Sequence, residues 1–363
     1  MSAFVIAARR TAVVPRGGAF AKLSIEDLAA PVITALLADA GLGPQDVDEV
    51  ICSNALGAGG NPARRVALAA GLSERVAGLS TDRQCVGGLD ALLIARAMVD
   101  SGAVRVVIAG GVESYSRRPI RLATDPKGGP SMPYEQPPFT PWPARDPDVT
   151  EAAAALAQRL GITRNDQDHY AVHSHARAVA AQGRMAAEIV PISGQVRDAF
   201  TRPLNLALAQ RAAVLSGTIT PANTAVAADA AAFVVVVGDG LVRRGGVRMA
   251  CGVTLGARPE EPALGAIPAM QEALRLAGIG KGDLRVAELM EAYAVQAIAC
   301  AEALGLDMSR VNLGGGALAR GHPIGASGAI LAVRMFHELT DGLGLAAISA
   351  AGGLGTAVVF ERV

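Results

Sequence analysis

The sequence lacks a net charge, a cysteine framework and any long hydrophobic run, and each absence excludes a class of protein. Thirty-three basic residues balance 33 acidic ones, without the basic surplus of a nucleic-acid-binding protein. Four cysteines without paired spacing exclude a disulfide framework or a zinc knuckle and indicate a reducing compartment. No run approaches the roughly 20 apolar residues of a membrane span. We therefore expect no nucleic-acid partner, no metal and no membrane insertion.

Targeting signals are also lacking, and aromatic residues are few. The first residues, MSAFVIAARRTAVV, have no signal-peptide core, and the final ERV is no peroxisomal signal. Aromatic residues make up 3% of the chain, whereas 51% is hydrophobic and 18% charged. This apolar surplus excludes a disordered chain and indicates a large core or subunit interfaces. We expect a cytoplasmic, oligomeric α/β protein.

Glycine, by contrast, is abundant and clustered. The chain contains 42 glycines in 363 residues, about 12%, against a usual value of about 7%. Clusters end three apolar stretches, at residues 104–114, 311–328 and 346–360. Such strand ends allow tight turns in which backbone amides approach a ligand. Close strand–helix packing is the better explanation of any single cluster, but three clusters together indicate a site.

The chain also contains an internal repeat. AGLGPQDVDEV begins at Ala40 and AGIGKGDLRVAEL at Ala277, an offset of 237 residues. Both patterns predict a helix that ends at glycine, then a turn and a strand. The same offset relates Cys85 to His322. We therefore predict two related β/α halves, residues 1–240 and 247–363, whose equivalent turns bring this cysteine and histidine to one pocket.

An insertion of about a hundred residues interrupts the first half, at about 117–217. Its first part, 117–148, is rich in Pro and Gly and predicts an irregular excursion. Two helices are expected next, each beginning at a threonine cap, Thr150 and Thr163. The insertion is either a lid beside a ligand or a purely structural or oligomerising element.

Cys85 and His322 are the residues best suited to chemistry. Cys85 begins an apolar helical run, where the helix dipole and free amides are expected to stabilise a thiolate and to hold an oxyanion. His322 is held in a turn by Pro323 and the surrounding glycines. A lone cysteine is otherwise a small buried hydrophobe, which is the interpretation we keep for the others. These other cysteines are Cys52, Cys251 and Cys300. The histidines in the helical segment lack the spacing of a metal site, and they are His169, His173 and His175.

The sequence resembles the thiolase family over almost the whole chain. The matching stretches are VIAARRTAV, GNPARRVALAAGL, RQCVGGLDA, AGGVESYS, VNLGGGALARGHPIGASG and AAGGLGTAVVFE. The resemblance implies a thiolase fold, in which duplicated βαβαβαββ halves form a five-layered αβαβα sandwich with an inserted loop domain. It also implies coenzyme A thioester substrates, no tightly bound cofactor, and a homodimer or homotetramer.

The resemblance further implies roles for individual residues. Cys85 matches the nucleophile that becomes acylated, and His322 matches the base that activates it and later the thiol of coenzyme A. The amides of Cys85 and Ala351 match the hole for the thioester oxygen. Other matched positions belong to the substrate pocket, Met290, Glu291, Tyr293 and Gly353, or to coenzyme A binding, Asn223 and Ala225.

Three of the matched positions depart from the family pattern. Ser349 replaces the second cysteine, an acid/base for the carbon atom, and an alcohol is a far weaker acid than a thiol. Met290 replaces an asparagine that holds a water beside the enolate oxygen. Ala225 replaces a serine that contacts the pantetheine arm. Two of these changes affect carbon–carbon bond formation and leave acyl transfer intact.

Three functions are therefore compatible with the sequence. The first is a thiolase-type acyltransferase that cleaves or forms 3-ketoacyl-CoA. The second is a diverged acyltransferase or thioester hydrolase without carbon–carbon chemistry. The third is a non-catalytic thiolase-like partner subunit. Because both Cys85 and His322 are present, an enzyme with an acyl-cysteine intermediate is the function that we favour.

Overall fold

The two halves of the chain form two strand sets with the same pairing pattern. The computed structural model describes residues 2–242 and 245–362. In hydrogen-bonding order, the first set is β3 (Glu49–Ser53), β5 (Val106–Glu113), β9 (Ala228–Gly238) and β1 (Ala3–Thr11), and the second is β11 (Leu284–Leu289), β12 (Gly342–Ala350), β13 (Leu354–Arg362) and β10 (Val247–Gly256). In each set the first pair is parallel and the next two are antiparallel. This repetition confirms the predicted duplication.

The two sets are joined edge to edge. Antiparallel pairing of Phe4 with Arg248 and of Val5 with Val247 links β1 to β10. Three short strands extend the first set: β4 (Leu79–Thr81) pairs with β3, β2 (Val14–Pro15) with β9 and β8 (Ile189–Val190) with β1. The strand β9 is buried along its whole length. Its valine-rich run therefore forms the centre of the first set.

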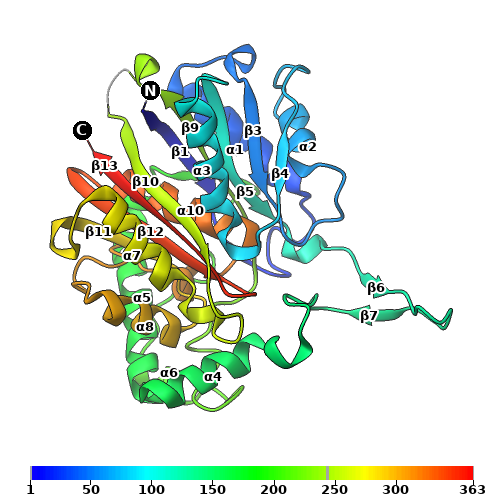
Figure 1. The fold of residues 1–363 in the computed structure, drawn as a ribbon, viewed down its shortest axis with the longest axis vertical. Helices are drawn as coiled ribbons and strands as arrows, with labels where there is room; N and C mark the ends of the chain where they lie inside the picture. Colours follow the sequence, from blue (N-terminus) through cyan, green and yellow to red (C-terminus); the bar gives the residue numbers. More distant parts are fainter. Residues whose placement is uncertain (1, 243–244, 363) are drawn as a thin grey trace.

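Helices complete a five-layered αβαβα sandwich, as the resemblance to the thiolase family implies (Figure 1). Helices α3 (Gly87–Asp100) and α10 (Ile324–Glu338) lie between the two strand sets and share one apolar core with both. Helices α1 (Ile25–Ala40) and α2 (Pro62–Ala69) pack on the outer face of the first set. Helices α7 (Ala266–Ala277) and α8 (Ala294–Leu304) pack on the outer face of the second.

The repeated helix ends have equivalent geometry. Helix α1 ends at Gly41, with φ of 64°, and α7 ends at Gly278, with φ of 67°. Each of these left-handed caps is followed by a turn and then by β3 or β11. Glycine takes this conformation without the steric cost that a Cβ imposes. The offset of 237 residues therefore reports a repeated structure.

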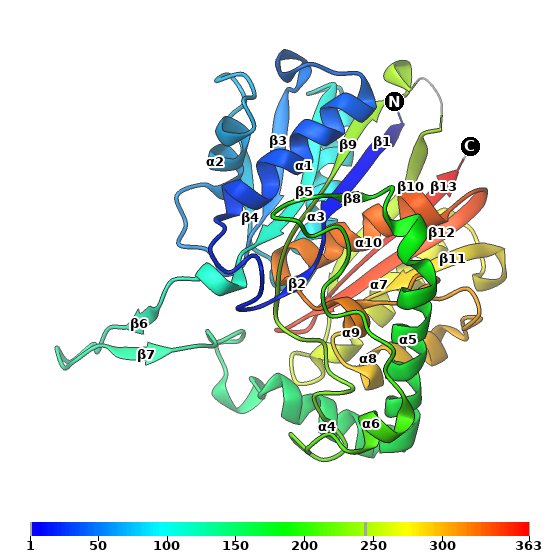
Figure 2. The ribbon, with the colours of Figure 1, turned by 180° about the vertical axis from the view of Figure 1, so that it is seen from behind.

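The insertion comprises a helical part and a projecting arm. Helices α4 (Val149–Leu160) and α5 (Arg164–Met185) lie beside α8, α5 also contacts α9 (Ala317–Arg320), and α6 (Leu206–Gln210) packs against α5. Thr163 caps α5 as predicted, whereas Asp148 caps α4 in place of Thr150. The arm, residues 118–142, carries the hairpin β6 (Arg121–Ala123) and β7 (Met132–Tyr134) and extends away from the body in both views (Figures 1 and 2).

Across the described residues, the helices fall short of the length and apolar character that a membrane span requires.

Candidate active site

Cys85 lies in a tight turn that directly precedes α3. The turn, Gln84–Val86, is a single 3-10 segment. Gln84 has a left-handed backbone with φ of 52°, which is uncommon for a residue with a side chain. Asp82 Oδ1 holds this conformation by accepting hydrogen bonds from the backbone N of Gln84 at 3.0 Å and from its Nε2 at 3.1 Å. The turn therefore presents Cys85 in a fixed position at the start of the helix.

The helices that follow Cys85 and His322 cross with their backbones in close contact. A Cβ atom at Gly88 would lie 2.4 Å from the backbone N of Ala329, and one at Gly328 would lie 2.5 Å from that of Leu89. Only glycine fits at such separations. This crossing draws the starts of α3 and α10 together. The structure accordingly places Cys85 Sγ 3.2 Å from His322 Nε2, although 237 residues separate them.

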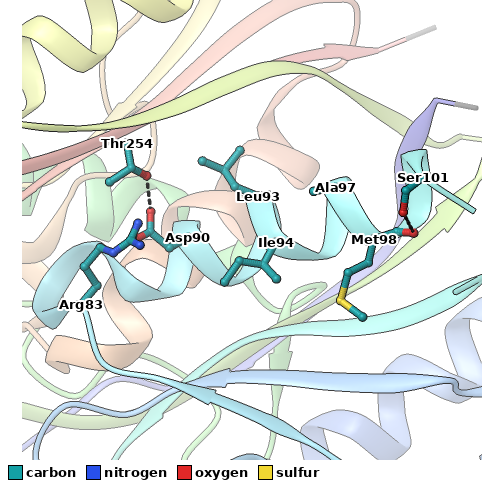
Figure 3. Close-up of a pocket in the computed structure, with 8 residues that line it drawn as sticks. All are labelled: Arg83, Asp90, Leu93, Ile94, Ala97, Met98, Ser101 and Thr254. Atoms are coloured by element: carbon teal, nitrogen blue, oxygen red, sulfur yellow. Dashed lines mark hydrogen bonds and ion pairs between the residues drawn. The ribbon is translucent and has the colours of Figure 1, made fainter. Parts of the chain in front are cut away.

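A buried carboxylate ties α3 to the second half of the chain. Asp90 Oδ1 accepts hydrogen bonds from the hydroxyls of Thr254 on β10, at 2.5 Å, and Thr356 on β13, at 2.6 Å. Asp90 Oδ2 accepts from Arg83 Nη1 at 2.8 Å, and Figure 3 shows Asp90 between Arg83 and Thr254 at the start of the helix. Because these strands carry the second half, Asp90 holds the Cys85 turn in register with His322.

The partner of the other imidazole nitrogen determines which tautomer His322 adopts. Ser327 Oγ donates to the carbonyl of Pro323 at 3.2 Å and lies 2.7 Å from His322 Nδ1. With its own proton directed at that carbonyl, the hydroxyl accepts from Nδ1–H. Nε2 then carries the free electron pair and faces the Cys85 thiol. This tautomer is the one that a general base for Cys85 requires.

Burial disfavours the charged forms of both Cys85 and His322. Burial raises the pKa of the Cys85 thiol above its usual value, and the backbone amides of Cys85 and Ala351 oppose that shift only partly. Burial also lowers the pKa of His322. The sequence predicts a thiolate stabilised by the helix start, but here desolvation outweighs the helix-start amides. His322 Nε2, at 3.2 Å, lies within reach of the thiol proton.

Cys85 and His322 lie in the wall of a cavity of about 260 Å³. The wall combines residues from both halves of the chain, the loop domain and the arm. They include Leu56, Gln84, Tyr115, Glu135, Gln136, Pro137, Phe139, Val149, Thr224, Ala225, Pro262, Ala263, Ala292, Tyr293, Gln296, Ser349 and Ala351.

Four of the matched residues thus lie in the wall beside Cys85 and His322, namely Ala225, Tyr293, Ser349 and Ala351. The hydroxyl of Ser349 is fully engaged. It donates to the carbonyl of Ala263 at 3.0 Å and accepts from the backbone N of Ala266 at 2.9 Å. Its proton is therefore directed at a carbonyl of the protein and away from a bound substrate.

The structure places the other matched residues behind the wall. Glu291 is buried, and its carboxylate accepts from the hydroxyls of Tyr170 and Ser174 on α5, from Asn312 Nδ2 and from the backbone N of Leu318. Asn223 braces its own loop through Asp168 Oδ1 at 3.2 Å. Met290 is buried in the core between the strand sets, and Gly353 is a buried turn residue with φ of 74°. These residues therefore support the pocket without lining it.

Sequence reasoning did not identify Ser327 or Glu113 as parts of the site. Glu113, at the end of β5, accepts from the backbone N of Gly325 at 3.0 Å and of Ala55 at 3.1 Å, which anchors the start of α10. Burial raises the pKa of this carboxyl to about 7 despite those bonds. Ser327 stands one helical turn beyond Pro323, and this spacing in the sequence could have identified it as a neighbour of His322. No comparable local signal marks Glu113.

Within residues 2–242 and 245–362, His, Cys, Asp and Glu side chains form no group of three or more suited to a metal ion.

Comparison with known proteins places this site in a family. Residues 3–239 match the thiolase N-terminal domain, and residues 247–362 match the thiolase C-terminal domain. A putative acetyl-CoA C-acetyltransferase, YhfS, of Bacillus subtilis (strain 168) is 36% identical, and the match covers 99% of both chains. An acetyl-CoA acetyltransferase of Escherichia coli (strain K12) is 35% identical, covering 99% of this chain and 98% of the relative.

Solved structures agree with these matches. Human mitochondrial 3-ketoacyl-CoA thiolase in complex with CoA superposes with a TM-score of 0.91 and 28% identity, covering 100% of this chain and 98% of that one. A second structure of the human enzyme gives a TM-score of 0.92 at the same identity. Similarity therefore extends over both halves and the insertion. The chain belongs to the thiolase family of acyl-CoA acyltransferases.

Proposed function

We propose that the protein is a thiolase-type acyltransferase that forms an acyl-enzyme on Cys85 from an acyl-CoA, and that it cleaves or forms 3-ketoacyl-CoA thioesters. Coenzyme A enters as a substrate and no tightly bound cofactor takes part. The observation that carries the proposal is the distance of 3.2 Å between Cys85 Sγ and His322 Nε2 in the wall of a cavity. A thiol and a neutral imidazole at this distance are suited to nucleophilic catalysis.

The first half-reaction uses groups that face one another. His322 Nε2 accepts the thiol proton as the Cys85 sulfur attacks the thioester carbon. The amides of Cys85 and Ala351 stabilise the negative charge on the carbonyl oxygen. The intermediate then expels the thiolate of coenzyme A, which takes the proton from His322 and leaves as a thiol. Cys85 now carries the acyl group as a thioester.

Intact mass spectrometry after incubation with acyl-CoAs of several chain lengths tests this step. We expect a mass gain equal to one acyl group, which is lost in Cys85→Ala and retained in Ser349→Ala. Ser349→Ala is the matched control because its side chain lies in the same wall. The proposal is abandoned if no acyl-CoA yields an adduct, or if the adduct persists without the Cys85 sulfur.

A second function is favoured by the contacts of Ser349. Carbon–carbon bond formation needs a group that removes a proton from the α-carbon of a second thioester. The Ser349 hydroxyl is held between Ala263 and Ala266, and an alcohol is a poor acid/base for this step. The alternative is therefore a thioester hydrolase, or an acyltransferase that loads Cys85 and passes the acyl group to an oxygen or carbon nucleophile of a specialised metabolite.

We also propose that the chain forms a homodimer or homotetramer in the cytoplasm. A hollow on α3, away from the Cys85 pocket, is lined by Leu93, Ile94 and Met98 (Figure 3). The edge strand β4 carries the exposed Leu79. An apolar hollow and an unpaired strand edge each suit a second copy of the chain. Light scattering after size exclusion should give twice or four times the chain mass, and a monomer contradicts this proposal.

A further inference from the structure

A second cavity, of about 420 Å³, adjoins the catalytic pocket at the base of the arm. Tyr115 and Glu135 belong to the walls of both cavities, so the two spaces meet at these residues. The second wall also contains Arg16, Arg118 and Arg121, against which Glu135 is the one carboxylate among the described residues that line it. The cavity therefore carries an excess of positive charge beside an apolar catalytic pocket.

Arg118 is the best-placed anion-binding group in this cavity. Its guanidinium carbon lies 4.6 Å from the centre of the Tyr115 ring, which fixes the side chain at the junction. It forms an ion pair with Glu135, whose side chain is 81% exposed. Its Nη1 is buried and has no hydrogen-bond partner in the described part of the chain. An unpaired buried donor of this kind is costly unless a ligand satisfies it.

The two other arginines reinforce this field to different extents. Arg121 donates one hydrogen bond, from Nη2 to the carbonyl of Ala55 at 3.0 Å, which directs its guanidinium toward the body of the protein. The guanidinium carbon of Arg16 lies 5.5 Å from the centre of the same Tyr115 ring. Asp229, which Ser116 binds through its backbone N and its hydroxyl, offsets part of the charge of Arg16. With Glu135 on Arg118 and Asp229 near Arg16, the cavity keeps a net positive charge, to which Arg121 contributes without an ion-pair partner among the described residues.

The course of a bound acyl-CoA leads from Cys85 toward this cavity. On the proposed function, we place the acyl chain of the Cys85 thioester among the lining residues Leu56, Tyr115 and Phe139 of the catalytic pocket. Because Tyr115 also lines the basic cavity, a chain that extends past it reaches that cavity. An uncharged chain end would leave the Arg118 donor unsatisfied there.

We propose that the preferred substrates are acyl-CoA thioesters whose acyl chain ends in a carboxylate, which Arg118 and Arg121 bind in place of Glu135. This inference rests on the proposed function, because it names the substrate class of the same site. In the free protein, Glu135 forms an ion pair with Arg118 from an exposed position on the arm, and a substrate carboxylate displaces Glu135 from this pair. Paired charge-assisted hydrogen bonds make arginine selective for such a group.

The first experiment compares rates of Cys85 acylation by matched pairs of thioesters. Succinyl-, glutaryl- and adipyl-CoA are each compared with the uncharged thioester of equal length, butyryl-, pentanoyl- and hexanoyl-CoA. We expect at least one carboxylated member to react about tenfold faster or more than its partner, as hydrogen bonds to a charged group imply. Equal or slower reaction of all three carboxylated thioesters overturns the inference.

Variants then assign the preference to the basic cavity. Arg118→Gln and Arg121→Gln should each reduce the ratio of carboxylated to uncharged rates by about tenfold. Glu135→Gln should raise that ratio, because it removes the internal competitor. Arg275→Gln, at an exposed position on α7 that pairs with Glu272, is the matched control and should leave the ratio unchanged. An unchanged ratio in both Arg118→Gln and Arg121→Gln contradicts the assignment.

Binding measurements separate this inference from the proposed function. In Cys85→Ala, where no acylation can occur, calorimetry gives the Kd of adipyl-CoA, hexanoyl-CoA and coenzyme A itself. We expect Arg118→Gln to weaken only adipyl-CoA in this background. Equal weakening of coenzyme A would assign the arginines to its phosphates and overturn the inference. If uncharged thioesters load Cys85 but the carboxylated ones show no preference, the proposed function stands and the substrate class is wrong.

Discussion

At the scale of single residues, the site depends on the hydrogen-bond partner of each polar atom. The imidazole of His322 has one nitrogen on the Cys85 sulfur and the other on Ser327 Oγ. The Ser327 hydroxyl donates its own proton to the carbonyl of Pro323. It therefore accepts from Nδ1–H of His322 and selects the imidazole tautomer. We therefore expect Ser327 to act as a positioning residue, whose effect on the rate passes through His322.

Substitution of Ser327 tests that role. We expect Ser327→Ala to slow Cys85 acylation by about 10- to 100-fold, a part of what general-base catalysis contributes, while the melting temperature changes little. Because burial lowers the pKa of His322, wild-type acylation should lose its base only well below pH 6.5. Ser327→Ala should alter this acid limb, and Ser327→Thr should restore it in part. A rate loss that matches the loss of folded protein would leave Ser327 with a merely structural role.

Ser349 and Met290 allow a second test at this scale. If the alternative function is correct, Ser349→Cys combined with Met290→Asn should raise thiolysis of acetoacetyl-CoA, because a thiol and a water-binding amide supply the two groups that carbon chemistry needs. Steady-state thiolysis, with Cys85→Ala added as the blank, measures the effect. The change of Ser349 also releases the amide of Ala266, so the melting temperature is recorded alongside. No gain in rate from a folded double variant argues against our account of these two positions.

At the scale of elements, two helices deliver the reactive pair. The turns before α3 and α10 converge because Gly88 and Gly328 let the helix backbones touch. Asp90 then fixes α3 against β10 and β13, and Glu113 fixes the start of α10. A small displacement of either helix would widen the distance from Cys85 Sγ to His322 Nε2. The active site therefore depends on close helix packing as much as on its two reactive residues.

A methyl group at the crossing should separate the helices. Gly88→Ala places a Cβ against the backbone N of Ala329, and we expect a loss of about 1–3 kcal/mol in the free energy of unfolding together with slower acylation. Gly183→Ala, on α5, is the matched control, because a Cβ there meets no atom within 4 Å. That change should stabilise the protein by roughly 0.5–1 kcal/mol. Chemical denaturation of both variants checks the contrast, and equal stabilities would show that the crossing tolerates a side chain.

At the scale of the whole molecule, a buried ion network joins the halves and the insertion. Glu188 accepts from Arg10 Nε on β1 at 2.7 Å and from Arg334 Nη1 on α10 at 2.6 Å. Asp198 pairs with Arg10 at 2.6 Å. Although burial opposes ionisation, the two arginines lower the pKa of Glu188 to about 2. The network therefore holds two halves and one insertion through a single carboxylate.

The pH dependence of stability follows from the sign of that shift. A carboxyl whose folded pKa lies below its unfolded value of about 4.3 stabilises the protein above that value. This contribution disappears as the pH falls toward 2. We expect the melting temperature to drop between pH 5 and pH 2, and to drop less in Glu188→Gln. That variant should already be destabilised at pH 7 by about 3–5 kcal/mol, and an unchanged melting temperature at pH 7 would contradict the role of the network.

Much of this architecture is determined by the sequence alone, because its signals are local or repeated. Glycine caps, apolar strands and the offset of 237 residues predicted the duplicated halves and paired Cys85 with His322. Each signal depends on a few neighbouring residues or on a direct comparison of two segments. Backbone preferences and hydrophobic patterning act over such short ranges.

Tertiary structure alone decided what each side chain contacts. Glu291 supports the pocket from behind, Ser327 selects the tautomer of His322, and burial of Cys85 overrides the influence of the helix start. The arm brings Arg118 and Glu135 to the edge of the pocket. Hydrogen-bond partners and desolvation arise from segments that are distant in the sequence, and no local pattern encodes them.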